Sequence, residues 1–87
     1  RRPVAIASIM GGSNSEVREG TKNIVLEAAY FHPVAIRRAS RDLGLSTDAS
    51  KRFERGTDPN LIVLALNRVV ELIQSLAGGS AAAEMLD

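Results

Sequence analysis

The sequence of 87 residues contains no cysteine. This absence excludes disulfides and thiolate metal sites, and it suits a reducing compartment such as the cytoplasm. The single histidine, His32, cannot build a metal cluster by itself. Aromatic residues make up only 3% of the chain, so any core must be aliphatic. The sequence therefore predicts no metal site and no cofactor of its own.

Long apolar runs and a strong charge imbalance are also missing. No uninterrupted apolar run approaches the roughly 20 residues that are needed to cross a bilayer. The basic start, Arg1-Arg2-Pro3, leads into too few uncharged residues for a secretory signal. The formal net charge is only +1, so bulk charge predicts no partner. We therefore expect a cytoplasmic protein without a membrane partner.

The length of the chain suffices for one small domain with a marginal core, because short chains bury a small fraction of their surface. An apolar, strand-like run begins at Val4, and a further segment over residues 81–86 is cut off at Asp87. Such elements usually pair with something outside the chain. We therefore expect a truncated part of a larger domain, whose unpaired strand edges favour self-association.

Two apolar runs and three helical patterns follow one another along the chain. The predicted strands cover about residues 4–10 and 23–31, and the predicted helices cover about residues 33–43, 48–55 and 59–77. Pro33 suits a first helical position, and Gly44 is a typical left-handed stop. Thr47 can cap the second helix. This order predicts an α+β (or α/β) fold, with three helices packed on a small sheet.

The last helix carries an apolar stripe at steps of three and four residues, and this stripe is predicted to be buried. It consists of Leu61, Ala65, Val69, Leu72 and Leu76. Polar residues including Asn67 and Glu71 lie roughly opposite and are expected to face water.

Glu27 stands in the middle of the second apolar run. Strand alternation could place it on a wet face beside Val25 and Ala29. If Glu27 is instead inside, its burial costs several kcal/mol unless hydrogen bonds or a partner charge compensate. A buried acceptor of this kind would let a pocket distinguish a hydroxylated ligand from its unhydroxylated twin. The residues alone leave both interpretations open.

Two further features have a functional and a simple structural interpretation. Gly11-Gly12 could expose backbone N–H groups to a ligand, although a plain tight turn is the more common meaning of such a pair. Residues 36–56 hold six basic and three acidic side chains. Such a patch can neutralise phosphates, but a solvated face with internal ion pairs is the more common outcome. The candidates for phosphate contact are Arg37, Arg38 and Arg41.

Four strings of residues resemble the central editing domain in the β subunit of bacterial phenylalanyl-tRNA synthetase. They are MGG (residues 10–12), NIVLEAAYF (23–31), IRRASRDLGLSTDAS (36–50) and RFERGTDP (52–59). Each string is unremarkable alone. Their order and spacing make the resemblance specific, and it covers nearly the whole chain.

The resemblance implies an enzyme that joins phenylalanine to its tRNA with ATP and Mg²⁺, as an assembly of two α and two β subunits. Aminoacylation belongs to the α subunit, so ATP and Mg²⁺ serve the whole enzyme and neither is expected in this chain. The β-subunit domain hydrolyses tyrosine that was wrongly attached to tRNA(Phe). The implied partners are mischarged tRNA(Phe), the α subunit and the remainder of the β subunit.

Carried over by motif, Glu27 corresponds to the carboxylate that recognises the tyrosine hydroxyl, and Gly11 lies against the same end of the ring. Thr47 and Ala49 line the remainder of the amino-acid pocket. No catalytic residue is implied, because hydrolysis in this family uses a positioned water. The resemblance also favours burial of Glu27.

The family's pocket uses a further segment with a histidine that this chain lacks, so the isolated chain is expected to be inactive. An alternative interpretation is a non-catalytic module of the same subunit, which braces the subunit and contacts tRNA through its basic helices.

Overall fold

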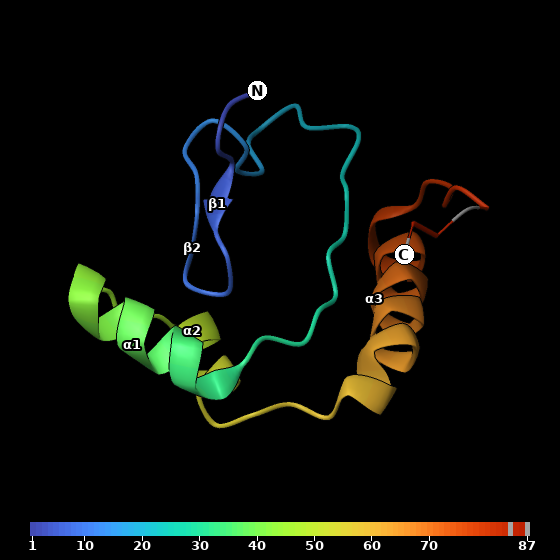
Figure 1. Ribbon diagram of the computed structural model, residues 1–87. Helices are drawn as coiled ribbons and strands as arrows, with labels where there is room; N and C mark the ends of the chain where they lie inside the picture. Colours follow the sequence, from blue (N-terminus) through green and yellow to red (C-terminus); the bar gives the residue numbers. More distant parts are fainter. Residues whose placement is uncertain (84, 87) are drawn as a thin grey trace.

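The computed structural model describes residues 1–83 and 85–86. Its element order is β1 (Ala5–Ile6), β2 (Met10–Gly11), α1 (Pro33–Leu43), α2 (Asp48–Phe53), a 3₁₀ turn η1 (Pro59–Leu61) and α3 (Ile62–Ala77). Figure 1 shows the hairpin above α1 and α2, with α3 standing apart from them. The small sheet and three α-helices confirm the predicted α+β class. Residues 81–83 and 85–86 have no regular structure, and residue 84 lies outside the described part.

The first apolar run is a hairpin and not the single strand predicted over residues 4–10. Strands β1 and β2 pair in antiparallel register, with Ala5 opposite Gly11 and Ile6 opposite Met10. Between them, Ser8 takes a positive φ of 54°, and the Ile9 amide donates to the Ile6 carbonyl at 2.9 Å. A left-handed residue reverses the chain within a short turn. The two halves of the run can therefore pair with each other.

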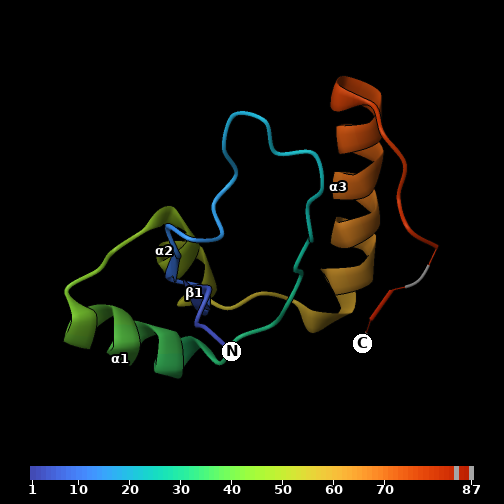
Figure 2. The same cartoon turned by 90° about the horizontal axis from the view of Figure 1, so that it is seen from above.

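The strand predicted over residues 23–31 is wrong. The segment is irregular in this structure, and Figures 1 and 2 show it as an extended stretch between the hairpin and α3. A strand needs a neighbour to accept and donate its backbone hydrogen bonds. Within the described residues, β1 and β2 form the sheet, and it has no further strand. The segment therefore stays unpaired, with Val25 98% exposed.

Helix α1 has the predicted bounds, because local signals set both of its ends. Pro33 occupies the first turn, where its missing N–H is not needed. Gly44 ends the helix with a φ of 64°, and its N–H donates to the Ser40 and Arg41 carbonyls. Such a left-handed glycine satisfies carbonyl groups that the last turn leaves free.

Helix α2 ends at Phe53, two residues before the predicted end. The amides of Arg55 and Gly56 donate to carbonyls three residues earlier, at 3.3 and 3.1 Å. Gly56 then takes a φ of 91°. The last turn therefore tightens into 3₁₀ geometry and breaks the α-helix before Gly56.

The core lies between the hairpin, α1 and α2. In the described part of the chain, the buried residues are Ile9, Ile36, Ser40 and Ser50. The Ser40 hydroxyl donates to the Leu45 carbonyl, and this bond satisfies a polar group inside. Phe31 packs edge-on against Phe53, with ring centroids 5.1 Å apart. This aromatic pair attaches the end of the extended segment to α2.

Helix α3 begins one 3₁₀ turn after the predicted start, and its covered face differs from the predicted one. Asp58 caps η1 by accepting from the Asn60 amide at 2.9 Å. The half-buried residues of α3 are Ile62, Leu66, Val70 and Ile73, whereas the stripe predicted to be buried is exposed. Because the covered residues and the predicted stripe adjoin each other on one broad apolar surface, periodicity alone cannot identify the covered part.

The last helix is apolar on average, although Asn67, Arg68 and Glu71 interrupt its apolar residues. The helical stretch Pro59–Ala77 has a mean hydropathy of 1.4 over an 18-residue window. By length and composition alone, it is long and apolar enough to cross a membrane. No residue of that window is buried. One such helix is weak evidence for a membrane protein, because core helices of soluble proteins pass the same test.

Candidate functional site

A hydrogen-bonded junction joins the hairpin to α2. The Thr47 hydroxyl donates to the Ile9 carbonyl at 2.7 Å and accepts from the Ser50 amide at 3.1 Å. The Ser50 hydroxyl accepts from the Thr47 amide at 2.9 Å and donates to the Thr47 carbonyl at 3.0 Å. This reciprocal arrangement is a capping box, in which serine occupies the position usually held by Glu or Gln. It places Thr47 between two structural elements.

The two glycines of the hairpin differ in what surrounds them. A Cβ added to Gly12 would lie 2.7 Å from the Val4 carbonyl oxygen and 2.7 Å from Asn14 Oδ1, so the hairpin itself requires glycine there. A Cβ added to Gly11 would meet nothing within 4 Å, and Gly11 has no positive φ. The tight-turn interpretation therefore explains Gly12 and leaves Gly11 without a structural reason.

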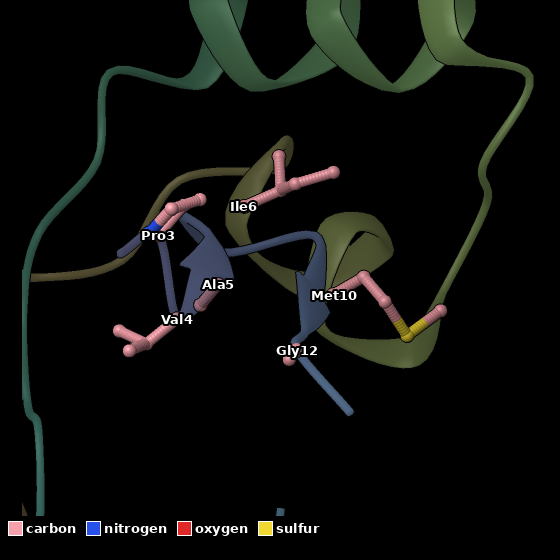
Figure 3. A pocket seen from close by; sticks show the side chains of 7 residues that line it. Pro3, Val4, Ala5, Ile6, Met10 and Gly12 are labelled. Carbon is pink, nitrogen blue, oxygen red and sulfur yellow. The ribbon is translucent and has the colours of Figure 1, made fainter. Parts of the chain in front are cut away.

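Gly11 lines an open hollow on the hairpin, with a volume of about 230 Å³. Its lining residues are Pro3, Val4, Ala5, Ile6, Met10, Gly11 and Gly12. Figure 3 shows that Val4 and Met10 point to opposite sides of this hollow. A second open hollow of about 450 Å³ lies where the extended segment approaches the ends of α2 and α3. It is lined by Ala28, Ala29, Phe53, Thr57, Asp58, Leu61, Ile62 and Ala65.

Glu27 is exposed, so the expectation that it is buried is wrong for this structure. Within residues 1–83 and 85–86, its carboxylate takes part in no hydrogen bond or ion pair, and it lines neither hollow. The cause is the unpaired state of residues 23–31: no neighbouring strand covers this side of the segment. A carboxylate in water also avoids the free energy that burial would require.

The other predicted pocket residues lie on the hairpin and α2. Thr47 is half-buried at the junction, and Ala49 is exposed in the first turn of α2. Gly11 follows Ile9 by two residues, so the Thr47–Ile9 hydrogen bond brings the hairpin and α2 sides together. The structure thus connects Gly11, Thr47 and Ala49 through adjoining elements and leaves Glu27 outside their contacts.

The three arginines of α1 are not equivalent. Arg37 donates to the Glu54 carbonyl at 3.2 Å and thereby fixes the end of α2 against α1. Arg38 and Arg41 are exposed, and in the described part of the chain neither forms an ion pair. The internal ion pairs expected of a solvated face are therefore not formed by Arg38 and Arg41 in the described residues. Both side chains remain available for an external anion.

Sequence reasoning missed Ile9 and Ser50. Ile9 is 3% exposed and Ser50 is 1% exposed, which makes them the most buried residues of the junction. The spacing of Thr47 and Ser50 at the start of a helix is a signal that could have indicated the capping box. No local pattern indicates the contact with Ile9, which lies 38 residues from Thr47. Among the described residues, no group of three or more His, Cys, Asp and Glu side chains could hold a metal.

Comparison with known proteins gives a consistent result. Residues 1–78 match the B3/4 domain family. The chain is 58% identical over 86 residues to a phenylalanine–tRNA ligase β subunit of Protochlamydia amoebophila, covering 99% of this chain and 11% of that relative. It is 59% identical over 78 residues to the subunit of Syntrophus aciditrophicus, covering 90% of this chain and 10% of that relative.

A third relative, the phenylalanine–tRNA ligase β subunit of Geobacter metallireducens, is 57% identical over 84 residues. The chain thus spans about a tenth of the length of the curated relatives it matches. The chain belongs to the B3/4 domain family, and the segments it resembles lie within phenylalanine–tRNA ligase β subunits.

Proposed function

We propose that this chain forms one wall of the pocket in a phenylalanine–tRNA ligase β subunit that hydrolyses tyrosyl-tRNA(Phe). The observation that carries this proposal is Gly11, a glycine that neither backbone strain nor a neighbouring atom requires. Glycine within a strand lowers the stability of the folded protein by about 0.5–1 kcal/mol relative to alanine, because glycine loses more conformational freedom on folding. The absence of a side chain at Gly11 leaves space for a ligand ring, and this would explain why glycine stands at this position.

The amino-acid side of the proposed pocket comprises Gly11, Thr47, Ala49 and Glu27. Gly11 and Ala49 leave room for the ring, and they lie on the two elements that the Thr47–Ile9 hydrogen bond joins. Glu27 supplies the selectivity, because its exposed carboxylate can accept a hydrogen bond from a phenol. Phenylalanine has no hydroxyl to donate to that carboxylate. In the complete subunit, other segments that shield Glu27 and the bound substrate from water would strengthen this discrimination.

Hydrolysis in this proposal needs no nucleophile from the chain. The pocket holds the ester and a water in reacting geometry, so rate enhancement comes from proximity and orientation. The partners are tRNA(Phe) carrying tyrosine, the α subunit and the remainder of the β subunit. ATP and Mg²⁺ serve aminoacylation elsewhere in the whole enzyme. The isolated chain is inactive in this account, because it supplies one wall only.

A second function is supported by a different observation. Arg38 and Arg41 are exposed on α1 without ion-pair partners in the described residues. Two basic side chains on the same helix can neutralise tRNA phosphates. The chain would then act as a structural module that contacts tRNA without chemistry. Both functions can reside in one subunit, on different faces.

The proposal is tested with Glu27→Ala in a full-length β subunit that carries this sequence. We expect hydrolysis of tyrosyl-tRNA(Phe) to fall about 10- to 100-fold, the effect of losing one hydrogen bond to a charged group. Hydrolysis of phenylalanyl-tRNA(Phe) should change little. Glu71→Ala on α3 is the matched control, because Glu71 is also exposed. Equal rates for wild type and Glu27→Ala on both esters would rule out this role.

A further inference from the structure

The hydroxyl group of Thr47 is already used by the fold. A hydroxyl has one proton to donate and two lone pairs to accept with. The Thr47 proton goes to the Ile9 carbonyl, and one lone pair accepts from the Ser50 amide. A substrate group that needs a hydrogen-bond donor therefore cannot obtain one from Thr47 while both bonds are intact.

The contact with Ile9 also has no substitute. In the part of the chain that the structure describes, it is the one hydrogen bond that joins the hairpin to α1 or α2. It lies in the best-covered region of the molecule, because Ile9 and Ser50 are both buried. A hydrogen bond in partly buried surroundings is electrostatically stronger than one in water, so it helps to fix geometry.

We propose that Thr47 is a positioning residue, which locks the hairpin that carries Gly11 onto the helix that carries Ala49. Its role in any pocket is to hold the two sides at a fixed separation, without donating a hydrogen bond to the substrate. The structural part of this proposal stands on the hydrogen bonds alone, whereas its consequence for hydrolysis rests on the proposed function.

Substitution of Thr47 by valine separates the hydroxyl from the shape of the side chain. Valine keeps the branched form, but it leaves the Ile9 carbonyl and the Ser50 amide without their partner. Thr47→Ser keeps the hydroxyl and removes only a methyl group. The hairpin should therefore open more often in Thr47→Val than in wild type. In Thr47→Ser it should open about as often as in wild type.

The test is amide hydrogen exchange in a full-length β subunit, read at Ile9 and Gly12. Both amides donate within the hairpin, to Ile6 and Val4 respectively. We expect exchange to be about five- to tenfold faster in Thr47→Val, which is the effect of losing one net hydrogen bond. In Thr47→Ser, exchange should be near the wild-type rate. Thr57→Val is the control, because Thr57 is exposed and distant in the chain from the hairpin. Unchanged exchange in Thr47→Val would overturn the proposal.

Hydrolysis of tyrosyl-tRNA(Phe) by the same variants tests the functional part. The proposal expects slower hydrolysis in Thr47→Val together with faster exchange, and recovery of both in Thr47→Ser. Slower hydrolysis with unchanged exchange would assign Thr47 a direct contact with the substrate and contradict positioning. If Thr47→Val speeds exchange while both Thr47→Val and Glu27→Ala leave hydrolysis unchanged, the lock stands and the proposed function fails.

Discussion

The hairpin with α1 and α2 differs from α3 in how it is held. In the described residues, all of the buried side chains belong to the first region, and α3 contributes none. The first region combines two buried isoleucines with two buried serines whose hydroxyls are bonded to backbone. Helix α3 exposes large apolar side chains, including Leu64 at 66% and Leu76 at 83%.

This difference shows that apolar content alone does not locate a core. Helix α3 is the most apolar of the three α-helices, yet the hydrogen bond from Thr47 to Ile9 joins the hairpin to α2. Capping residues and hydroxyl bonds specify geometry between neighbouring elements, whereas an apolar helix face packs against any complementary surface. Gly11, Thr47 and Ala49 of the proposed pocket therefore lie in the first region, where the geometry is fixed, whereas Glu27 lies in the extended segment outside it.

The largest expected effect comes from breaking the core of the first region. Ile36→Ala should destabilise it by about 2–5 kcal/mol, because deletion of buried methyl groups leaves a cavity. Leu64→Ala on the exposed face of α3 should change stability by less than about 0.5 kcal/mol. Exchange of the α1 amides measures the first effect and exchange of the α3 amides measures the second, both in the full-length subunit. Equal effects would mean that the two regions are held alike.

The next effect separates the two glycines. Gly12→Ala should destabilise the hairpin by about 1–3 kcal/mol, because its Cβ would overlap the Val4 carbonyl. Gly11→Ala should leave the hairpin intact and reduce hydrolysis of tyrosyl-tRNA(Phe), because the added methyl group occupies the space of the ring. Hairpin amide exchange and ester hydrolysis, measured on both variants, check the two statements. A Gly11→Ala subunit with wild-type hydrolysis would remove Gly11 from the pocket.

A smaller effect concerns self-association of the 87-residue chain. If the exposed face of α3 drives it, Leu64→Gln combined with Leu72→Gln should weaken the dimer by about tenfold or more, since each loses apolar contact area. Val25→Gln is the matched control on the unpaired segment, where Val25 is exposed. Sedimentation velocity over a concentration series measures the shift. Dissociation by Val25→Gln alone would assign the contact to strand edges.

The smallest effect concerns tRNA. Arg38→Gln should lower the slope of log affinity against log salt by about 1 and weaken binding a few-fold, because one phosphate contact is lost. Arg68→Gln on α3 should leave the slope unchanged, because Arg68 is paired with Glu71 at 2.8 Å. Filter binding of uncharged tRNA(Phe) at several salt concentrations gives both slopes. Identical slopes for wild type and Arg38→Gln would argue against tRNA contact by α1.

Local signals in the sequence predicted part of this fold correctly. Pro33 and Gly44 define α1, and Thr47 caps α2, because such signals act within a few residues. Residues 23–31 were predicted to be a strand, but strand formation depends on a neighbour that no local pattern reveals. The covered face of α3 was predicted wrongly for a similar reason, since its apolar surface is wider than one stripe and no local pattern shows which part has a neighbour.

The candidate site was predictable to a comparable degree. The strings of residues indicated the family, which the comparisons confirm. Spacing could not distinguish Gly11 from Gly12, because the distinction depends on where the Val4 carbonyl lies in space. The bond between Thr47 and Ile9 was also out of reach, because it spans 38 positions. Whether Glu27 meets a substrate remains a prediction.

The most direct test is a structure of the full-length β subunit bound to a non-hydrolysable analogue of tyrosyl-adenosine, in which an amide replaces the ester. The account predicts that the phenol oxygen lies about 2.5–3.0 Å from a carboxylate oxygen of Glu27, the usual range for such hydrogen bonds. It also predicts that the ring lies against Gly11, with the hairpin locked to α2 through Thr47. A tyrosine bound elsewhere, with Glu27 facing solvent, would contradict the account.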